Sequence, residues 1–573
     1  MTAPAELLPP RRSSPLKRYG PVAAVLAAIA LVAGLASVGA SDRSATTTGG
    51  PTVNGVATGD PTANPDLPIT YQEAIQSGKG DNYAFKNCDP VTGRIKVPSI
   101  YAPPCVAPVN DHGKGKATTP GVTGDTIKVV YYLPPKDDQI AKLLAIYLDP
   151  QDVQNRTRDK FVEYFNHSYE MWGRHVKIVP FQATGQSDDV EAARADALKV
   201  VDLHPFASIG GPNLTPAYGD ELAKNKIMCF VCGLALPDSS FQANAPYSWG
   251  PLPTPEQFIV NVGDYIAGRL NNRKASFGGP AVKDRMRRFG VVHFEQNPPV
   301  FTAVSAVIEK EGRKRGFVSA DTEVYTLDLA KLPERAATII AKLKAADVTT
   351  VIFLGDPIMP ISLTKEATKQ DFFPEWVVTG TLLTDSTTLG RIYDPAQWAH
   401  AFGISNLAVR TPLDQQEGYR LYQWYFGQPP EAVKTQALLY QALGTLFLGI
   451  HMAGPNLTPQ TFQGGLFKYP PSGGGPTTPQ ISFGKHGYFV HPDYLGIDDS
   501  TEIWWDKDAV GPNEQGTVGK GMWRYVDGGK RYAPGRMPRT APRAFIPEGS
   551  VTSFDTPPPE DQYPDPAKYQ PRK

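Results

Sequence analysis

Short apolar runs alternate with longer stretches of helical periodicity in the first half of the chain. The runs at residues 127–132, 176–181, 206–209 and 227–236 are rich in residues that favour strands. Between them, apolar side chains recur every three or four positions, as at 152–172, and this spacing predicts helices. Strands that alternate with helices through short connections form a parallel sheet covered by helices on both faces. The first half of the chain therefore predicts a doubly wound α/β unit.

A second series of the same kind begins near residue 289. The sequence predicts strands at 289–294, 322–326, 350–354 and 376–379, and helices at 300–315 and 333–346. A strongly apolar helix is predicted next at 436–452, followed by a shorter helix at 459–466 and a strand at 502–505. The fold class is therefore α/β, with two parallel-sheet lobes. A chain of 573 residues is also too long for one hydrophobic core, so two or more folding units are expected.

The amino-terminal segment is typical of a membrane anchor or a signal peptide. Residues 21–40 carry no charge, and Arg11, Arg12, Lys17 and Arg18 precede them. About twenty apolar residues can span a bilayer, and basic residues favour the cytoplasmic side. Residues 1–20 would then be a cytoplasmic basic segment, and the body would lie outside the cell membrane on a single span. Small residues before Ser41 also fit a cleavage site, in which case the protein is secreted.

Composition separates flexible flanks from the folded body. The prolines concentrate near the two ends, which predicts a flexible linker at 41–67 and a disordered proline-rich tail at 541–573. Lys plus Arg and Asp plus Glu number 57 each, so the net charge is zero and nothing favours nucleic acid as a partner.

The four cysteines predict two disulfides in an oxidising compartment. Proximity suggests Cys88 with Cys105, which would tie an extension at 68–120, and Cys229 with Cys232. The second pair has Cys-x-x-Cys spacing, so a redox role is the alternative. It falls at a predicted strand end rather than at the start of a helix, which favours a structural disulfide. No second Cys or His pair lies at zinc spacing, so no metal and no cofactor are expected.

Several motifs resemble the type 1 periplasmic binding proteins, in particular the branched-chain amino acid branch that supplies ABC importers. They lie at residues 124–129 (GDTIKV), 208–212 (SIGGP), 288–292 (RFGVV), 343–352 (LKAADVTTVI) and 441–443 (QAL). The resemblance implies that the chain crosses three times between two hinged lobes. The first lobe would comprise 121–250 and 385–475, and the second 251–384 and 480–525. A ligand would be held between the lobes, which close around it.

The resemblance also implies ligand contacts by position. The first lobe would contribute Asn213, Leu214, Ala235, Leu236 and Trp249, and the second Glu295, Gln296, Asn297, Asp356 and Thr381. Where amino-acid binders of this family place hydroxyls for the ligand carboxylate, this chain has Pro212, Asn213 and Leu214. An α-amino acid brings two charges that need partners once desolvated. We therefore expect a less polar or differently charged small molecule.

The leading hypothesis is an extracytoplasmic solute-binding protein that delivers a small molecule to the permease of an ABC importer. The alternative is a membrane-tethered interaction or sensor protein that kept the fold without a transported ligand. An enzyme is not expected, because the sequence has no nucleophile elbow, His-rich metal set or paired carboxylate motif.

Overall fold

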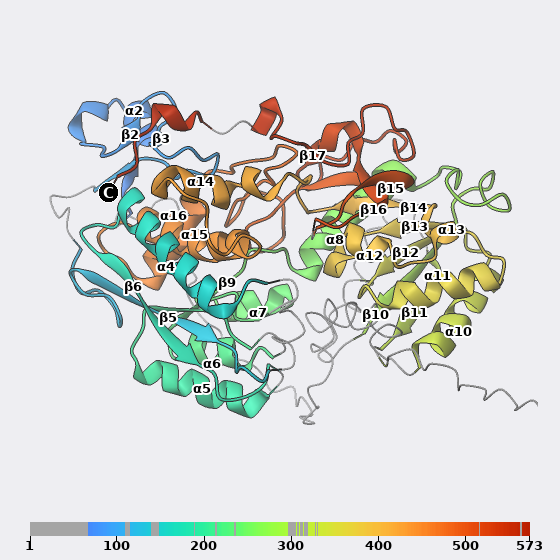
Figure 1. Cartoon of the computed structure of the whole chain (residues 1–573), viewed down its shortest axis with the longest axis horizontal. Coiled ribbons are helices and arrows are strands. Elements are labelled where there is room, and N and C mark those ends of the chain that lie inside the picture. The colour runs from blue at the N-terminus through green and yellow to red at the C-terminus, as the bar shows by residue number, and fades with distance from the viewer. Residues whose placement is uncertain are drawn as a thin grey trace, which may run out of the picture.

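The computed structural model describes most of the chain after residue 66. It covers residues 67–108, 115–138, 148–187, 189–212, 215–233, 236–295, 319–326, 331–514, 516–561 and 564–572, together with positions 305, 309, 313 and 328. Two α/β lobes lie side by side, and the carboxyl-terminal segment, drawn in red, runs along one face of both (Figure 1).

The first lobe is built on a five-stranded parallel sheet. Its strand order is β6-β5-β7-β8-β9, with β5 (Thr126–Leu133), β6 (His175–Gln182), β7 (Ala207–Ile209), β8 (Met228–Phe230) and β9 (Ser248–Trp249). The connecting helices are α4 (Gln151–Ser168), α5 (Val190–Asp202), α6 (Ala217–Lys224) and α7 (Asp238–Ala243). Successive side chains of a strand point to opposite faces, so Val129 joins the core beside α4 while Val130 joins the core beside α5 and α6. The predicted parallel sheet is confirmed.

Three late helices complete the first lobe. They are α14 (Glu417–Phe426), α15 (Gln436–Ala453) and α16 (Pro459–Lys468). Helix α15 packs on α4, where the ring of Phe447 stacks on that of Phe165 at 4.8 Å between centroids. This apolar helix, predicted at 436–452, therefore buries one side against α4 of the first lobe, which lies some 280 residues earlier in the sequence.

The second lobe has a mixed sheet in the order β11-β10-β12-β13-β14-β15-β16, with β17 paired to β15. The parallel strands are β10 (Phe289–Phe294), β11 (Ser319–Tyr325), β12 (Thr350–Leu354), β13 (Glu375–Val378) and β14 (Ala401–Ser405). The antiparallel strands are β15 (Ser500–Pro512), β16 (Val518–Tyr525) and β17 (Arg531–Tyr532).

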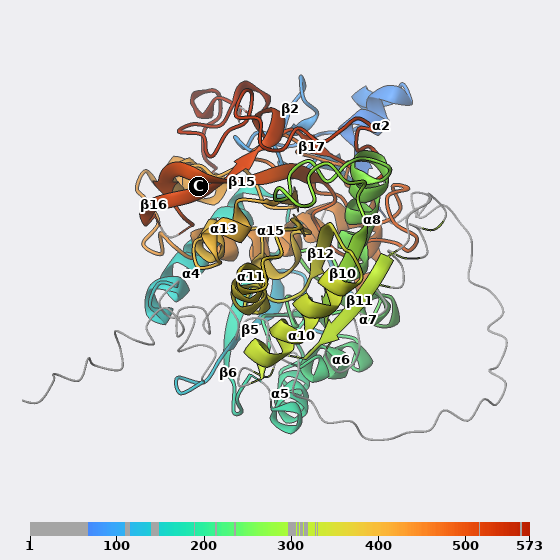
Figure 2. The same cartoon turned by 90° about the vertical axis from the view of Figure 1, so that its right-hand side faces the viewer.

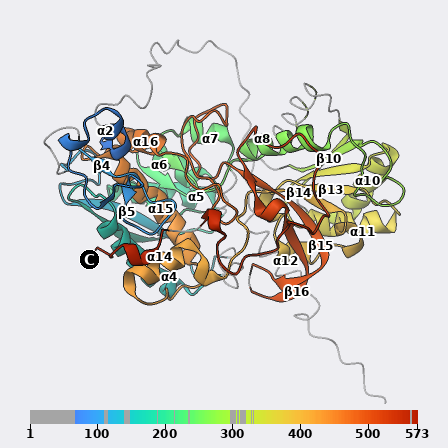
Figure 3. The ribbon, with the colours of Figure 1, turned by 90° about the horizontal axis from the view of Figure 1, so that it is seen from above.

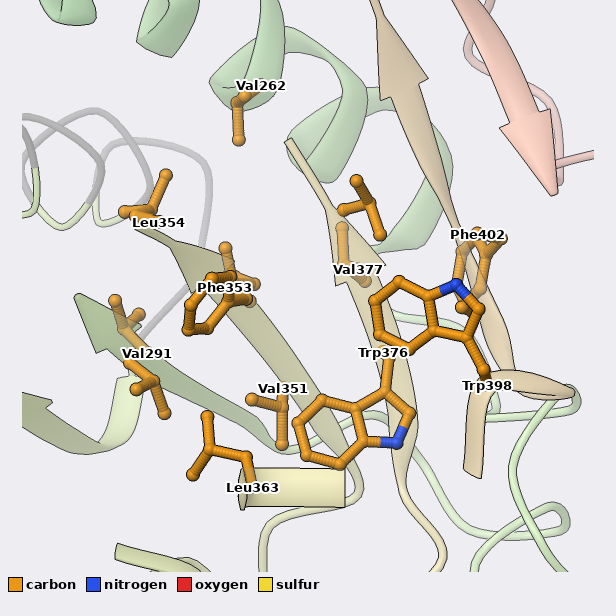
Figure 4. Close-up of a cluster of buried hydrophobic side chains, with 14 of the residues drawn as sticks. Val262, Val291, Val351, Phe353, Leu354, Leu363, Trp376, Val377, Trp398 and Phe402 are labelled. Atoms are coloured by element: carbon orange, nitrogen blue, oxygen red, sulfur yellow. The ribbon is translucent and has the colours of Figure 1, made fainter. Parts of the chain in front are cut away.

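Helices enclose the second sheet and bury its apolar residues. They are α8 (Pro255–Tyr265), α10 (Leu332–Ala345), α11 (Met359–Lys369), α12 (Thr387–Gly390) and α13 (Pro395–Trp398), and Figure 2 shows α10 and α11 in front of the sheet. Figure 4 shows Val351 and Trp376, from two neighbouring strands, beside Leu363 of α11. Val291 and Val377 belong to the other face of the sheet, because both are in register with Ile352. The helix predicted at 300–315 lies largely outside the described residues.

The chain crosses between the lobes at three places, which we call the crossovers. They are residues 250–254 between β9 and α8, 406–416 between β14 and α14, and 496–499 before β15. The predicted return to the first lobe at residue 385 is corrected to about 406, because β14 pairs in parallel with β13. Residues 385–405 also bury Leu389 and Trp398 in the second core.

The extension before β5 is a compact addition to the first lobe. Strand β1 (Ile69–Thr70) pairs with β4 (Val106–Ala107), β2 (Cys88–Asp89) pairs with β3 (Arg94–Ile95), and α2 (Tyr71–Gln76) lies between. Cys88 and Cys105 form a disulfide with their Cα atoms 5.5 Å apart.

The described residues after 541 pack on the second lobe, which corrects the prediction of a disordered flank. Ala544 is buried, and the ring of Phe545 lies 5.1 Å from that of Phe277. Val551 pairs with Tyr525 through two backbone hydrogen bonds. Composition pointed to disorder because of the prolines, but a few apolar side chains anchor the segment.

Within the described residues, no helix combines the length and apolar character needed to cross a bilayer. The predicted span at 21–40 lies outside them and stays a prediction.

Candidate functional site

A pocket lies at the carboxyl edge of the first sheet, beside the first crossover. Open parallel sheets bind ligands at this edge of their strands. The space between its walls amounts to about 190 Å³, part of it open to solvent. It is lined by Phe230 at the end of β8 and Val231 after it, by Trp249 at the end of β9 with Gly250 and Pro251 after it, and by Gln441, Ala442 and Thr445 of α15. The site therefore combines two strand ends with a helix that comes from much later in the chain.

A disulfide closes the turn that forms one wall of the pocket. Cys229 and Cys232 are bonded, as proximity suggests, and they enclose Phe230 and Val231. Val231 has a φ of 59°, a left-handed conformation that is strained for a β-branched residue. Its amide donates a hydrogen bond to the carbonyl of Trp249 at 3.0 Å. Disulfide and strand pairing together hold this wall in place.

Trp249 forms the back of the pocket and belongs to the first core. Its side chain is 1% exposed, and its ring lies 5.0 Å from Tyr494 and 5.6 Å from Phe462. Its indole Nε1 donates to the carbonyl of Pro246 at 2.8 Å. Because that donor is already engaged, Trp249 offers a ligand an apolar surface rather than a hydrogen bond.

Helix α15 presents an unusual open face at the pocket. Leu438, Gln441, Ala442 and Thr445 follow the spacing of one helical face. Leu438 is 57% exposed and Gln441 is exposed, whereas Leu439 and Leu443 on the opposite face are buried. The sequence did not predict a ligand contact on this face. The signal available was that the residues at positions 438, 441, 442 and 445 are all uncharged.

The residues predicted in the second lobe are largely engaged in its own structure. Asp356 is buried after β12, where it accepts hydrogen bonds from the amides of Ile358 at 2.7 Å and Met359 at 3.1 Å and from the Tyr325 hydroxyl. Burial raises the pKa of the Asp356 carboxyl, despite these hydrogen bonds. Its carboxylate thus starts helix α11 instead of reaching out towards a ligand ammonium.

The other predicted contacts stay predictions. Thr381 is buried, with its hydroxyl 3.0 Å from that of Thr379, and the Glu295 amide donates to the carbonyl of Tyr325. Leu236 is half-buried against the first core. Asn213, Leu214, Ala235, Gln296 and Asn297 lie outside the described residues. Of the described predicted residues, Trp249 is the one that lines the pocket.

The electrostatic character of the pocket follows from its lining. All eight lining residues in the described part of the chain are uncharged, and the side-chain polar groups among them are the Gln441 amide, the Thr445 hydroxyl and the engaged Trp249 indole. Across the described residues there is also no group of three or more His, Cys, Asp or Glu side chains that could hold a metal ion. The arrangement can bind a small uncharged molecule by apolar contact and one or two hydrogen bonds.

No family model matches the chain, and no curated protein matches its sequence. Among solved structures, the chain is similar to a solute-binding protein of an ABC transporter from Rhodopseudomonas palustris in complex with 3,4-dihydroxybenzoic acid. The identity is 13% and the TM-score 0.44, over 72% of this chain and 98% of that one.

Two further solved structures belong to amino-acid transporters. The branched-chain amino acid transporter substrate-binding protein LivJ from Streptococcus pneumoniae, in complex with isoleucine, is 12% identical with a TM-score of 0.42, over 70% of this chain and 100% of that one. An amino acid ABC transporter substrate-binding protein from Pseudomonas fluorescens is 10% identical with a TM-score of 0.47, over 72% and 95%. Likeness at this level says nothing of what this chain binds. All three of these solved structures are substrate- or solute-binding proteins of ABC transporters, the class that the sequence of this chain resembles.

Proposed function

We propose that the protein is a solute-binding protein that holds a small, uncharged and largely apolar molecule in the pocket at the edge of its first lobe, beside the first crossover. The observation that carries this proposal is the uncharged lining of the pocket at the carboxyl edge of the first sheet. A zwitterionic amino acid would lose its hydration there and meet no opposite charge among the lining residues, which is costly. A molecule with an aromatic or aliphatic body and one hydroxyl or carbonyl would match Trp249, Phe230 and the Gln441 amide.

Delivery of the solute to an ABC importer is part of the same proposal. The two-lobed fold and the predicted amino-terminal span support a body that is held outside the membrane and meets a permease. An uptake assay in cells that lack the protein would test this step, because transport should return with the full chain. A chain that binds the solute but restores no transport would favour the alternative of a tethered sensor.

Native mass spectrometry of the gently purified protein tests binding directly. We expect a small-molecule adduct that is lost in Ala442→Leu, because the larger side chain fills the pocket. Ala195→Leu is the matched control, since Ala195 is an exposed alanine on α5, away from the pocket. An adduct that survives Ala442→Leu would place the ligand elsewhere, and a clean apo mass for the wild-type chain would contradict the binding proposal.

A further inference from the structure

The segment after β16 makes a continuous series of contacts with the second lobe. We call residues 531–572 the tail. The Met537 amide donates to Asp264 of α8 at 3.0 Å, and Arg269 donates to the carbonyl of Ala541 at 3.0 Å. Phe545 then inserts its ring 5.3 Å from that of Trp504 on β15. The first half of the tail is thereby fixed to the second lobe.

Arg531, at the start of the tail, joins two of the three crossovers. Its buried guanidinium donates to the Asp499 carboxylate at 2.9 Å, in the third crossover. It also donates to the carbonyls of Asn406 at 2.8 Å and Leu407 at 2.7 Å, in the second crossover. Further along the tail, the Phe554 amide donates to the carbonyl of Arg410 at 2.9 Å, again in the second crossover. These backbone segments must rotate if the lobes move about the hinge.

Asp561 attaches the tail to the first lobe. Its carboxylate is fully buried and accepts hydrogen bonds from the Thr477 amide, the Thr477 hydroxyl at 2.7 Å and the Thr478 hydroxyl. Gly475 lies against it so closely that a Cβ there would be 1.5 Å from Asp561 Oδ1. Residues 472–481 form a turn whose Ile481 packs on the first core.

The tail ends against the extension and helix α14. The Tyr569 hydroxyl donates to Asp89 at 2.7 Å, and the indole of Trp424 donates to the carbonyl of Tyr569 at 3.2 Å. Viewed from above, the tail crosses from the lobe that carries β15 and β16 to the lobe that carries α14 (Figure 3). The tail is therefore attached to both lobes and to the second and third crossovers.

We propose that the tail is a strap that fixes the angle between the lobes, so that the angle is set before any ligand binds. Hinge closure would change the distance between Phe545, which packs on Trp504 of the second lobe, and Asp561, which is hydrogen-bonded to Thr477 and Thr478 of the first lobe. The strap would act whether or not the protein binds a solute, so this proposal does not depend on the proposed function.

Electron paramagnetic resonance distance measurements on the full chain test the strap. All four native cysteines are bonded, so spin labels attach to cysteines introduced at Glu191 of α5 and Glu334 of α10. We expect one narrow distance distribution for the wild-type chain. Asp561→Ala and Gly475→Ala disturb the same contact from opposite sides, and each should broaden the distribution about twofold as the lobes gain freedom.

The control is Asp555→Ala, which removes the same charge from an exposed position of the tail. It should leave the distribution unchanged. If both contact variants stay folded by circular dichroism and their distributions remain as narrow as that of the wild-type chain, the strap proposal is wrong.

Hydrogen exchange on the unaltered chain provides a second test that needs no variant. The amides of Val409 and Phe554 donate across the second crossover, to Pro476 and Arg410. A fixed hinge predicts that they exchange as slowly as core amides such as that of Val377. Exchange at the rate of exposed loops would overturn the proposal.

Discussion

Asp385 is a carboxylic acid held away from water near the carboxyl edge of the second sheet. Its side chain is 2% exposed, and Oδ2 accepts a hydrogen bond from the Ser405 hydroxyl at 2.5 Å. Oδ1 has no hydrogen-bond partner in the part of the chain that the structure describes. Burial raises the pKa of Asp385 from 3.8 to about 7. The group is thus neutral in the folded protein at mildly acidic pH.

This pKa shift predicts a loss of stability as the pH rises. Between pH 4 and 7 the folded state keeps a proton on Asp385 that the unfolded state releases, so the free energy of unfolding falls with increasing pH. Glu417 and Asp498, whose pKa values burial also raises to about 7, add to the same slope. In Asp385→Asn the drop between pH 5 and 8 should be smaller than in the wild-type chain by about 3 kcal/mol.

Denaturant unfolding at the two pH values measures this difference. Asp555→Asn is the matched control, because Asp555 is exposed and should leave the slope unchanged. Equal slopes for Asp385→Asn and the wild-type chain would show that Asp385 titrates normally.

Val231 provides a residue-scale test of the pocket wall. Glycine adopts a φ of 59° without strain. In Val231→Gly, the relief of backbone strain therefore offsets the stability lost with the side-chain contacts of Val231. We expect the free energy of unfolding to change by less than about 1 kcal/mol, whereas the adduct in native mass spectrometry should be weakened. A loss of about 2–4 kcal/mol, as for deletion of a core side chain, would contradict this account.

At the scale of elements, Arg391 holds the long ribbon of β15 and β16 against the second lobe. Its guanidinium donates to the carbonyls of Gly511 at 2.7 Å, Gly519 at 2.8 Å, Gly521 at 2.9 Å and Thr517 at 2.9 Å. One planar group thus bonds both strands of the ribbon, which the compact ammonium of lysine cannot do as well.

Removal of this contact should loosen the ribbon locally. In Arg391→Ala we expect the amides of residues 511–521 to exchange about tenfold faster or more, and Arg391→Lys should rescue them only in part. Hydrogen exchange with mass spectrometry measures this. Lys369→Ala is the control, because the Lys369 side chain is 72% exposed and pairs with Glu366 of its own helix. Unchanged exchange rates in Arg391→Ala would mean that the backbone hydrogen bonds between β15 and β16 are enough to protect these amides.

The elements that the sequence predicted best are those buried on both faces. Strands such as β10 and β12 are largely apolar runs because helices cover both sides of the sheet. Such strands can therefore be recognised from the local sequence alone. Strand β14 was assigned to the wrong lobe because its five residues, AFGIS, carry no sign of the sheet that they join. Pairing partners are set by tertiary contacts, which periodicity does not report.

Of the described residues predicted as ligand contacts, Trp249 is the one that lines the pocket. The resemblance placed it near the crossover, and it ends strand β9, at the edge of the sheet where ligands of such folds bind. The face of α15 that completes the pocket lies about 190 positions later in the chain, and its residues are chemically ordinary. The tail was missed because four or five apolar side chains among many prolines are enough to anchor it.

At the scale of the whole molecule, the buried pair of Arg531 and Asp499 lies where the second and third crossovers meet. The side chains are 0% and 2% exposed, and Asp499 also accepts from the amide of Gln480 at 3.0 Å. Arg531→Met would leave the carboxylate buried without its partner. We expect a loss of about 3–5 kcal/mol in the free energy of unfolding.

A double-mutant cycle with Asp499→Asn tests whether the pair is coupled. The double variant should be more stable than the sum of the two single losses implies. Arg156→Met is the control, because Arg156 is half exposed in its ion pairs with Asp152 and Glu431 and should cost less than about 1 kcal/mol. Strict additivity in the cycle would show that each residue acts through other contacts.

The bond between Tyr569 and Asp89 joins residues 480 positions apart. Bringing such distant parts of a flexible chain together carries a large entropic cost, which falls once the intervening lobes have formed and docked. The strap should therefore assemble last, after both cores, and its final contact would mark the completion of folding. If the chain folds after it has crossed a membrane, both lobes would be folded while the angle between them can still change. The final residues of the chain would then fix that angle.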